Sequence, residues 1–135
     1  MREANIFANL KSSPRSVWEV ITNKEDYSWR SDLEKIEIVD ETKFIEYHKS
    51  GNKTVFIIVD KIPYEEYRLN IFHDKFTGEW VAKLKEKSDG TTIEIYKKIE
   101  MTDKLTELMS YMSINMKMEQ KIYIRDLKKK LGEEV

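Results

Sequence analysis

The 135-residue sequence contains no cysteine, and it has only four glycines and two prolines. The absence of cysteine excludes disulfides, thiolate metal sites and cysteine nucleophiles, but it leaves the cellular compartment undecided. The glycines, at positions 51, 78, 90 and 132, are too scattered to form a loop that cradles phosphates. A G-x-S-x-G motif is also missing, so NTPases and hydrolases with an activated serine are poor candidates.

The sequence also lacks a charge excess and a long hydrophobic run. Lys and Arg total 24 against 25 Asp and Glu, which gives a formal net charge of -1. A nucleic-acid-binding protein usually carries a basic excess, so no nucleic acid partner is expected. The longest apolar stretch, Val55–Val59, is far too short for a transmembrane segment. Residues 1–5 carry charge and no apolar run follows them, so no secretory signal is visible and a cytoplasmic location is expected.

Motifs for metal ligands are missing as well. The two histidines, His48 and His73, have no partner at the spacing of an H-x-x-x-H or H-E-x-x-H motif, and no Asp-rich loop occurs. We therefore expect neither a metal site nor a cofactor. His73 follows Leu69 and Ile71 at every second residue and is placed on their side of a strand, where we favour a structural role over a proton shuttle.

The composition is typical of a globular protein with a strongly charged exterior, since 40% of the residues are hydrophobic and 36% are charged. A chain of this length buries roughly two thirds of the surface that its unfolded state exposes. We therefore expect one domain that comprises residues 1–135.

The N-terminal part of the chain predicts a strand followed by two short helices. Residues 6–10 alternate in polarity, which is typical of a strand. Ser13 followed by Pro14 predicts the start of a helix, with Ser13 as its N-cap and an end near Asn23. A second short helix is predicted around residues 25–29.

The middle of the chain, residues 33–101, predicts six strands of an antiparallel meander. Branched and aromatic residues alternate with charged ones through most of this region. Short turns separate the strands, as at Ser50-Gly51-Asn52 and Asp89-Gly90, where glycine and asparagine tolerate the positive φ of a hairpin.

The C-terminal part predicts one long helix. No turn signal occurs between Met101 and Gly132, and Thr102 or Asp103 can cap a helix that runs to about Leu131. At about 100° per residue, its apolar side chains form one broad and one narrow stripe. The broad stripe contains Leu105, Leu108, Met109, Met112, Met116, Tyr123 and Leu127, and the narrow stripe contains Tyr111, Ile114, Met118 and Ile122.

Together these elements predict an α+β fold of the helix-grip type, in the order β-α-α-β6-α. A curved antiparallel sheet of about seven strands would wrap around the long C-terminal helix. A single helix cannot fill the concavity of a strongly curved sheet unless large side chains or a ligand do so. The space between the sheet and the helix is therefore the predicted binding site.

Three short segments resemble the START-like and Bet v 1-like superfamily (SRPBCC), and especially its bacterial polyketide cyclase and dehydrase members. They are Ser13-Pro14-Arg15-Ser16-Val17-Trp18 after the first strand, Trp29 ahead of Leu33-Glu34-Lys35-Ile36-Glu37-Ile38, and Asp89-Gly90-Thr91-Thr92 before the last strand. The resemblance covers essentially the whole chain, and the order of the elements carries more of it than these loose motifs. It implies the helix-grip fold and a cavity for hydrophobic molecules such as lipids, sterols or polyketides. It implies no single function, because members include carriers, cyclases, co-chaperones and sensors.

We predict a cavity lined by inward-facing residues of the later strands and by the broad stripe of the last helix. The predicted lining residues are Tyr67, Leu69, Ile71, His73, Trp80, Ile95, Lys97, Met109, Met112, Met116, Glu119 and Tyr123. Trp80 is included because its neighbours on the same face of the strand, Gly78 and Ala82, are small and leave room for a ligand.

Two charged residues stand out in this set. Glu119 falls within the broad apolar stripe, where it would be a polar anchor or a general base with a raised pKa if it stayed unpaired. The alternative is an edge position that reaches solvent or pairs with a lysine. Lys97 falls by alternation on the side of Ile95 and Ile99, where it could meet Glu119 or an acidic ligand group. A slipped register would place Lys97 outside, and we favour that ordinary structural position.

Methionine is concentrated in the C-terminal part, since five of the six methionines lie at or after Met101. Methionine is flexible and polarisable, so a wall of methionines can adapt to varied apolar ligands. Ordinary core packing is the alternative interpretation, and the sequence does not decide between the two.

These observations favour three functions. The first is the binding of a small hydrophobic molecule in an internal cavity, as a carrier or sensor. The second is an enzyme of the polyketide cyclase or dehydratase type, which would need two converging ionisable groups, such as Glu119 with His73 or Lys97. The third is a protein-interaction module of the co-chaperone kind, in which the narrow helix stripe would bind a partner or form a homodimer.

Overall fold

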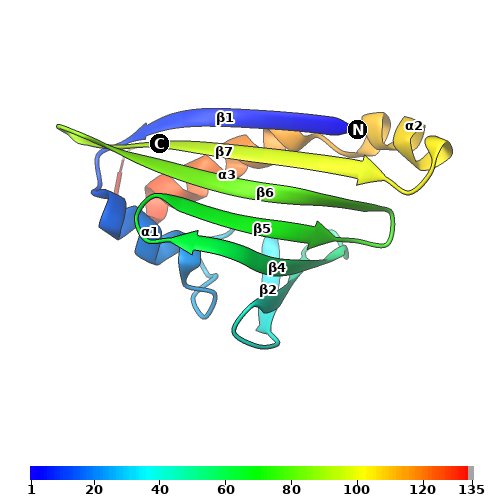
Figure 1. The fold of residues 1–135 in the computed structure, drawn as a ribbon, viewed down its shortest axis with the longest axis horizontal. Coiled ribbons are helices and arrows are strands. Elements are labelled where there is room, and N and C mark those ends of the chain that lie inside the picture. Colours follow the sequence, from blue (N-terminus) through cyan, green and yellow to red (C-terminus); the bar gives the residue numbers. More distant parts are fainter. Residues whose placement is uncertain (134–135) are drawn as a thin grey trace.

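A computed structural model describes the backbone of residues 1–133 and the side chains of residues 1–109 and 114–133. It contains seven strands and three helices, drawn in Figure 1. In chain order they are β1 (Arg2–Leu10), α1 (Pro14–Thr22), β2 (Leu33–Ile38), β3 (Lys43–His48), β4 (Lys53–Ile62), β5 (Glu66–Phe72), β6 (Phe76–Lys87), β7 (Gly90–Met101), α2 (Lys104–Ser113) and α3 (Met116–Lys130).

The strands form one antiparallel sheet in the order β1-β7-β6-β5-β4-β3-β2. Strands β2 to β7 follow one another as a meander, and β1 pairs with β7 from Arg2 opposite Ile99 to Leu10 opposite Thr91. The α+β class and the six strands between residues 33 and 101 are therefore confirmed. Because β1 and β2 lie at opposite edges, residues 11–32 cross from one edge of the sheet to the other, and α1 lies in this crossing segment.

The predicted hairpin turns are confirmed at both positions. Gly51 has a φ of 97° in the turn between β3 and β4, and Gly90 has a φ of 142° where β6 turns into β7. Residues other than glycine rarely adopt such positive φ angles, which explains why glycine occurs at these turns.

Helix α1 also has the predicted ends. The hydroxyl of Ser13 accepts a hydrogen bond from the backbone N–H of Ser16 at 3.2 Å, Pro14 is the first helical residue, and Asn23 is the C-cap. The second short helix predicted around residues 25–29 was wrong, because these residues form bends and turns. Asn23 and Asp26 stabilise this irregular backbone, since their side chains accept hydrogen bonds from the N–H groups two residues further on.

The prediction of a single long C-terminal helix was also wrong. The helix ends at Ser113, and a new helix begins at Met116 after Asn115, whose side chain accepts a hydrogen bond from the N–H of Met118 at 3.0 Å. Asparagine is a weak helix former but a strong N-cap, which explains the break. The order of elements is therefore β-α-β6-α-α, and the pattern β-α-α-β6-α needs correction in both of its helical parts.

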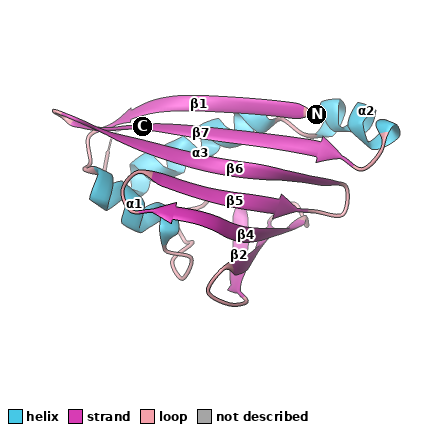
Figure 2. Cartoon of the chain, viewed as in Figure 1, coloured by secondary structure: helices cyan, strands magenta, loops and turns pink. Residues whose placement is uncertain are grey.

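The break changes what covers the sheet. Helix α3 contacts β1 and α1, and α1 contacts β6, so α1 and α3 lie on the same face of the sheet (Figure 2). Helix α2 lies beyond the end of β7 near the N-terminus (Figure 1). Only the last part of the predicted helix, α3, therefore lies across the sheet.

The core follows the alternation of the strands. On β5, Tyr67, Leu69 and Ile71 are buried, and they stand opposite Ala82, Trp80 and Gly78 of β6 in the antiparallel register. These strand residues pack with apolar side chains of α1 and α3, which are Val17, Trp18, Ile21, Met116, Tyr123, Ile124 and Leu127.

Candidate functional site

A cavity of about 350 Å³ lies between the sheet, α3 and the loop that precedes β2. Strands β3 to β7 all contribute to its wall, as do three residues of α3. Its lining residues are Lys24, Arg30, Asp32, Glu46, His48, Lys49, Ser50, Thr54, Phe56, Leu69, Ile71, Phe76, Trp80, Ile95, Lys97, Glu119, Gln120 and Tyr123.

One part of the wall is apolar and comes from the central strands. Its residues are Phe56, Leu69, Ile71, Phe76, Trp80 and Ile95, contributed by β4, β5, β6 and β7. The ring of Trp80 meets that of Tyr123 from α3 edge to face, with the centroids 5.5 Å apart. This part of the cavity can bury an apolar molecule, because contact with it removes hydrocarbon surface from water.

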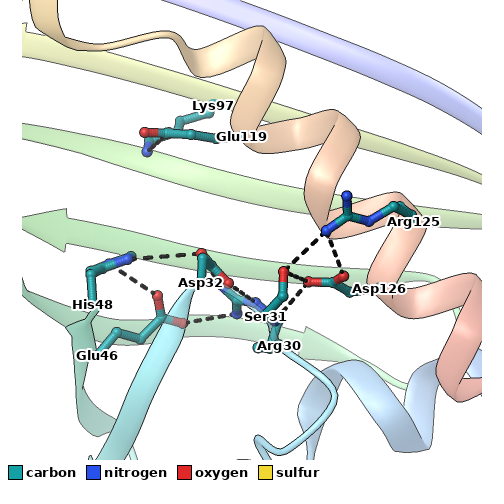
Figure 3. Close-up of polar contacts among 9 residues, drawn as sticks. All are labelled: Arg30, Ser31, Asp32, Glu46, His48, Lys97, Glu119, Arg125 and Asp126. Atoms are coloured by element: carbon teal, nitrogen blue, oxygen red, sulfur yellow. Dashed lines mark hydrogen bonds and ion pairs between the residues drawn. The ribbon is translucent and has the colours of Figure 1, made fainter. Parts of the chain in front are cut away.

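Another part of the wall holds a cluster of ion pairs in which Arg30 and Glu46 are largely shielded from water (Figure 3). The guanidinium of Arg30 donates to both carboxylate oxygens of Asp32, with its Nε at 3.2 Å and its Nη2 at 3.1 Å. Its Nη1 donates to Glu46 Oε2 at 3.2 Å. Glu46 is only 5% exposed, so this carboxylate depends on Arg30 for the charge and the hydrogen bond that replace water.

Aromatic side chains also hold Arg30 in place. Its guanidinium carbon lies 4.9 Å from the ring centre of Tyr123 and 5.7 Å from that of Trp29. Burial alone would lower the pKa of Arg30, but the carboxylates of Glu46 and Asp32 outweigh burial and raise it. Burial would likewise raise the pKa of Asp32, yet the neighbouring Arg30 lowers it overall. Arg30 and Asp32 are therefore both charged at neutral pH.

His48 extends the cluster toward the turn between β3 and β4. Its Nδ1 lies 3.8 Å from Asp32 Oδ2, and its Nε2 lies 3.7 Å from Glu46 Oε1. The imidazole is therefore placed between two carboxylates and lines the cavity. A ring in this position can donate a hydrogen bond to a ligand.

The loop that carries Arg30 and Asp32 is fastened to α3. Asp126 is 3% exposed, and its Oδ2 accepts hydrogen bonds from the backbone N–H of Ser31 at 2.8 Å and from the Ser31 hydroxyl at 2.7 Å. Arg125 donates to the same hydroxyl at 3.2 Å and to Asp126 Oδ1 at 3.4 Å (Figure 3). A helix residue therefore fixes the backbone between the two residues that build the cluster.

Lys24 places a further cation at the cavity. Its Nζ donates to the carbonyl oxygen of Ile21 at 2.9 Å and lies 4.8 Å from the ring centre of Phe44 and 5.2 Å from that of Tyr67. Burial lowers the pKa of Lys24 to about 8, although the carboxylate of Glu46 acts in the opposite direction.

Lys97 and Glu119 form a separate ion pair at the cavity wall, with Nζ and Oε2 3.3 Å apart (Figure 3). The register of β6 and β7 places Lys97 opposite Trp80 and on the cavity side, in agreement with the predicted lining and not with the outward alternative. Glu119 lines the cavity, as the first interpretation predicted. It is also half exposed and pairs with a lysine, as the alternative predicted.

Two buried polar atoms have no hydrogen-bond partner among the described residues, the Tyr67 hydroxyl and Gln120 Oε1. The orientation of the Gln120 amide is fixed, because its Nε2 donates to the carbonyl oxygens of Ala4 at 2.9 Å and Ile95 at 3.3 Å. Burial raises the pKa of Tyr67 above the range in which it would ionise, so this hydroxyl stays protonated.

Seven of the twelve predicted residues line the cavity: Leu69, Ile71, Trp80, Ile95, Lys97, Glu119 and Tyr123. Four others, all with described side chains, do not appear in its lining. Tyr67 and Met116 are buried in the core beside it. His73 stacks on Phe76 at the end of β5, and burial lowers its pKa. Met109 is 53% exposed on α2, and the side chain of Met112 lies outside the described residues.

The sequence-based prediction missed the charged cluster entirely. The alternation of β3 could have predicted two members of the cluster, Glu46 and His48, because they share one face of that strand with Phe44. Arg30 and Asp32 gave no such signal, since they lie in an irregular loop without periodicity. Their meeting with Glu46 depends on where the crossing segment passes over the sheet.

The described part of the chain contains no group of three or more His, Asp or Glu residues arranged to hold a metal ion. None of the helices described is long and apolar enough to cross a membrane.

No family model matches the chain, and no curated protein matches it either. Solved structures do match it over nearly the whole length. A protein from Mesorhizobium loti, MLL2253, is 13% identical with a TM-score of 0.76, and the match covers 97% of each chain. A conserved protein from Geobacillus kaustophilus is 15% identical with a TM-score of 0.77, over 97% of this chain and 95% of that one.

A third similar structure is DynU16, a protein in the dynemicin biosynthetic locus. It is 10% identical with a TM-score of 0.74, and the match covers 96% of this chain but 47% of DynU16. At these identities the likeness shows a shared fold. It shows no shared ligand or reaction.

Proposed function

We propose that this protein has a helix-grip fold of the START-like and Bet v 1-like kind and binds a small, mainly hydrophobic molecule in its cavity, as a carrier or sensor. The cavity carries the proposal. Its volume of about 350 Å³ lies within the range of about 300–1,000 Å³ that is typical of small-molecule sites. It combines an apolar wall with a few polar groups from other elements, which is also typical of such sites.

The apolar and the charged parts of the cavity wall would contribute differently to ligand binding. The apolar side chains of β4 to β7 would supply affinity, at about 25 cal/mol per Å² of apolar surface that the ligand buries. The cluster around Arg30 and the Lys97–Glu119 pair would orient the polar groups of the ligand, because hydrogen bonds in a low-dielectric site are costly to leave unmade.

Native mass spectrometry of the freshly purified protein tests this proposal. The expected spectrum contains, beside the free protein, a species whose added mass is lost on denaturation. Thermal unfolding with a panel of fatty acids, sterols and aromatic polyketides provides the second measurement. If no molecule is retained and no panel member raises the melting temperature, the proposed binding function is wrong.

Acid–base catalysis is a second candidate, because Lys97 and Glu119 lie 3.3 Å apart and both line the cavity. Such a pair can remove a proton next to a carbonyl group and return it. Deuterium exchange at the α-carbon of acetophenone would measure this step. We expect Glu119→Gln to abolish any acceleration and Glu86→Gln, at an exposed residue of β6 outside the cavity, to preserve it. An exchange rate equal to that of buffer excludes the activity for this probe.

The protein-interaction module and the homodimer stay predictions. In the narrow helix stripe, Met118 is exposed while Ile114 and Ile122 are half-buried. The side chain of Tyr111 lies outside the described residues. Light scattering of the purified protein would test the homodimer directly.

A further inference from the structure

The charged side chains that line the cavity do not balance one another. The cations are Lys24, Arg30, Lys49 and Lys97, and the anions are Asp32, Glu46 and Glu119. Apart from His48, the cavity therefore carries one positive charge in excess. A binding site with an excess charge is complementary to a ligand of the opposite sign.

Each of the anionic residues already has a cationic partner. Asp32 and Glu46 share Arg30, and Glu119 pairs with Lys97. Within the described side chains, the lining cations left without an ion pair are Lys24 and Lys49. Lys49 is exposed to water, which screens its charge. Among the described side chains, the half-buried Lys24 is therefore the lining cation that lacks an ion pair and is better shielded from water.

The surroundings of Lys24 leave most of its hydrogen-bonding capacity unused. An ammonium group has three N–H donors, and one protein acceptor, the Ile21 carbonyl, lies within reach at 2.9 Å. The faces of Phe44 and Tyr67 attract the cation but offer no carboxylate. Because burial lowers the pKa of Lys24 to about 8, the charged ammonium is less stable in this position than in water.

We propose that Lys24 anchors the headgroup of the ligand and that this ligand is an amphipathic monocarboxylate. The inference rests on the proposed function and specifies its ligand class. The carboxylate would accept hydrogen bonds from Lys24, and its hydrocarbon body would lie against the apolar wall that includes Leu69, Ile71 and Ile95. A monoanion cancels the excess charge of the cavity, a neutral headgroup leaves it unchanged, and a cation increases it.

Three probes of one chain length isolate the headgroup: octanoate, 1-octanol and octylamine. Each is titrated into the full-length protein at pH 7, and binding is followed by the methyl NMR signals of Ile71 and Ile95, which report from inside the cavity. We expect octanoate to bind at least about tenfold more tightly than octanol, as for a charge-assisted hydrogen bond, and octylamine to bind more weakly than octanol.

Lys24→Met is expected to remove the preference for octanoate while leaving the affinity for octanol unchanged. Lys24→Gln is the second variant, which serves if the methionine variant does not fold. Lys61→Met is the matched control, because Lys61 acts electrostatically on Lys24 but does not line the cavity. This control should keep the full preference for octanoate.

The outcomes separate the two proposals. Equal affinity of the wild type for octanoate and octanol overturns the role of Lys24 and leaves the binding function standing. A preference for octanoate that persists in Lys24→Met and Lys24→Gln also overturns it. If none of the three probes shifts the methyl signals, both the ligand class and the binding of linear hydrocarbon chains in this cavity are wrong.

Discussion

Lys24 and Arg30 are cations of the same loop, yet their pKa values shift in opposite directions. Arg30 has two carboxylate partners and a pKa above its ordinary value, whereas Lys24 has none within ion-pair distance among the described residues and a lowered pKa. The guanidinium is planar and has five donors, so it can serve two carboxylates at once. The ammonium of Lys24 lies over aromatic rings instead.

The lowered pKa of Lys24 predicts that stability rises with pH. Between pH 8 and 10.5 the unfolded chain keeps a proton on Lys24 that the folded protein has lost, so the free energy of unfolding increases with pH across this range. Glu46, Arg30 and Lys61 are the charged groups that act on this lysine. Urea denaturation of the wild type and Lys24→Met from pH 7 to 10 measures the effect. The variant should show a smaller rise, and identical pH dependence would contradict the prediction.

The buried cluster predicts a large loss of stability when Arg30 is removed. Arg30→Met leaves Glu46 buried without its partner, and we expect a decrease of about 3 kcal/mol in the free energy of unfolding. Arg15→Met is the control, because the Arg15–Glu19 pair is exposed to water and should contribute less than about 1 kcal/mol. Urea denaturation at pH 7 compares the two, and similar losses would show that the Arg30 cluster is not an essential part of the core.

Helix α3 and the loop before β2 together determine the shape of the site. The sequence predicted that the C-terminal helix would lie against the sheet, and α3 does so. It gave no sign that α3 would also hold the loop through Asp126, because that contact joins residues 95 positions apart. The end of the helix at Ser113 was missed for a local reason, since Asn115 carries a capping signal that the apolar periodicity around it obscured.

The contact between α3 and the loop predicts a graded response at Asp126. Asp126→Ala removes both hydrogen bonds to Ser31 and should lower the free energy of unfolding by about 2 kcal/mol. Asp126→Asn retains an oxygen acceptor in the same place and should cost less. Urea denaturation ranks the two variants. Hydrogen exchange of the Ser31 amide should increase mainly in the alanine variant, and unchanged exchange would show that another contact holds the loop.

In the molecule as a whole, side chains fill part of the space between the sheet and the helices and leave a cavity in another part. Ile93 and Ile95 lie on the same face of β7 and are both fully buried, yet only Ile95 lines the cavity. The two positions therefore distinguish filling the cavity from overpacking the core. Tertiary packing decides this difference, because both residues follow the same alternation along β7.

Because Ile95 lines the cavity and Ile93 does not, the same substitution should have different effects at the two positions. Ile95→Phe can extend into the cavity, so we expect little loss of stability but at least about tenfold weaker binding of octanoate or octanol. Ile93→Phe has no free space and should lower stability by about 1–3 kcal/mol. Thermal unfolding and the NMR titration measure the two effects. Strong destabilisation by both variants with undiminished ligand affinity would show that the cavity is not the binding site.

The sequence by itself determined the elements that depend on neighbouring residues. Alternation indicated the strands, Ser13 and Pro14 marked the start of α1, and glycines marked two hairpin turns. Tertiary structure alone decided that Arg30 meets Glu46, that Lys24 has no ion pair among the described side chains and that a cavity remains beside them. The physical reason is that ion pairing and desolvation depend on distances between segments far apart in the chain, and local periodicity carries no information about those distances.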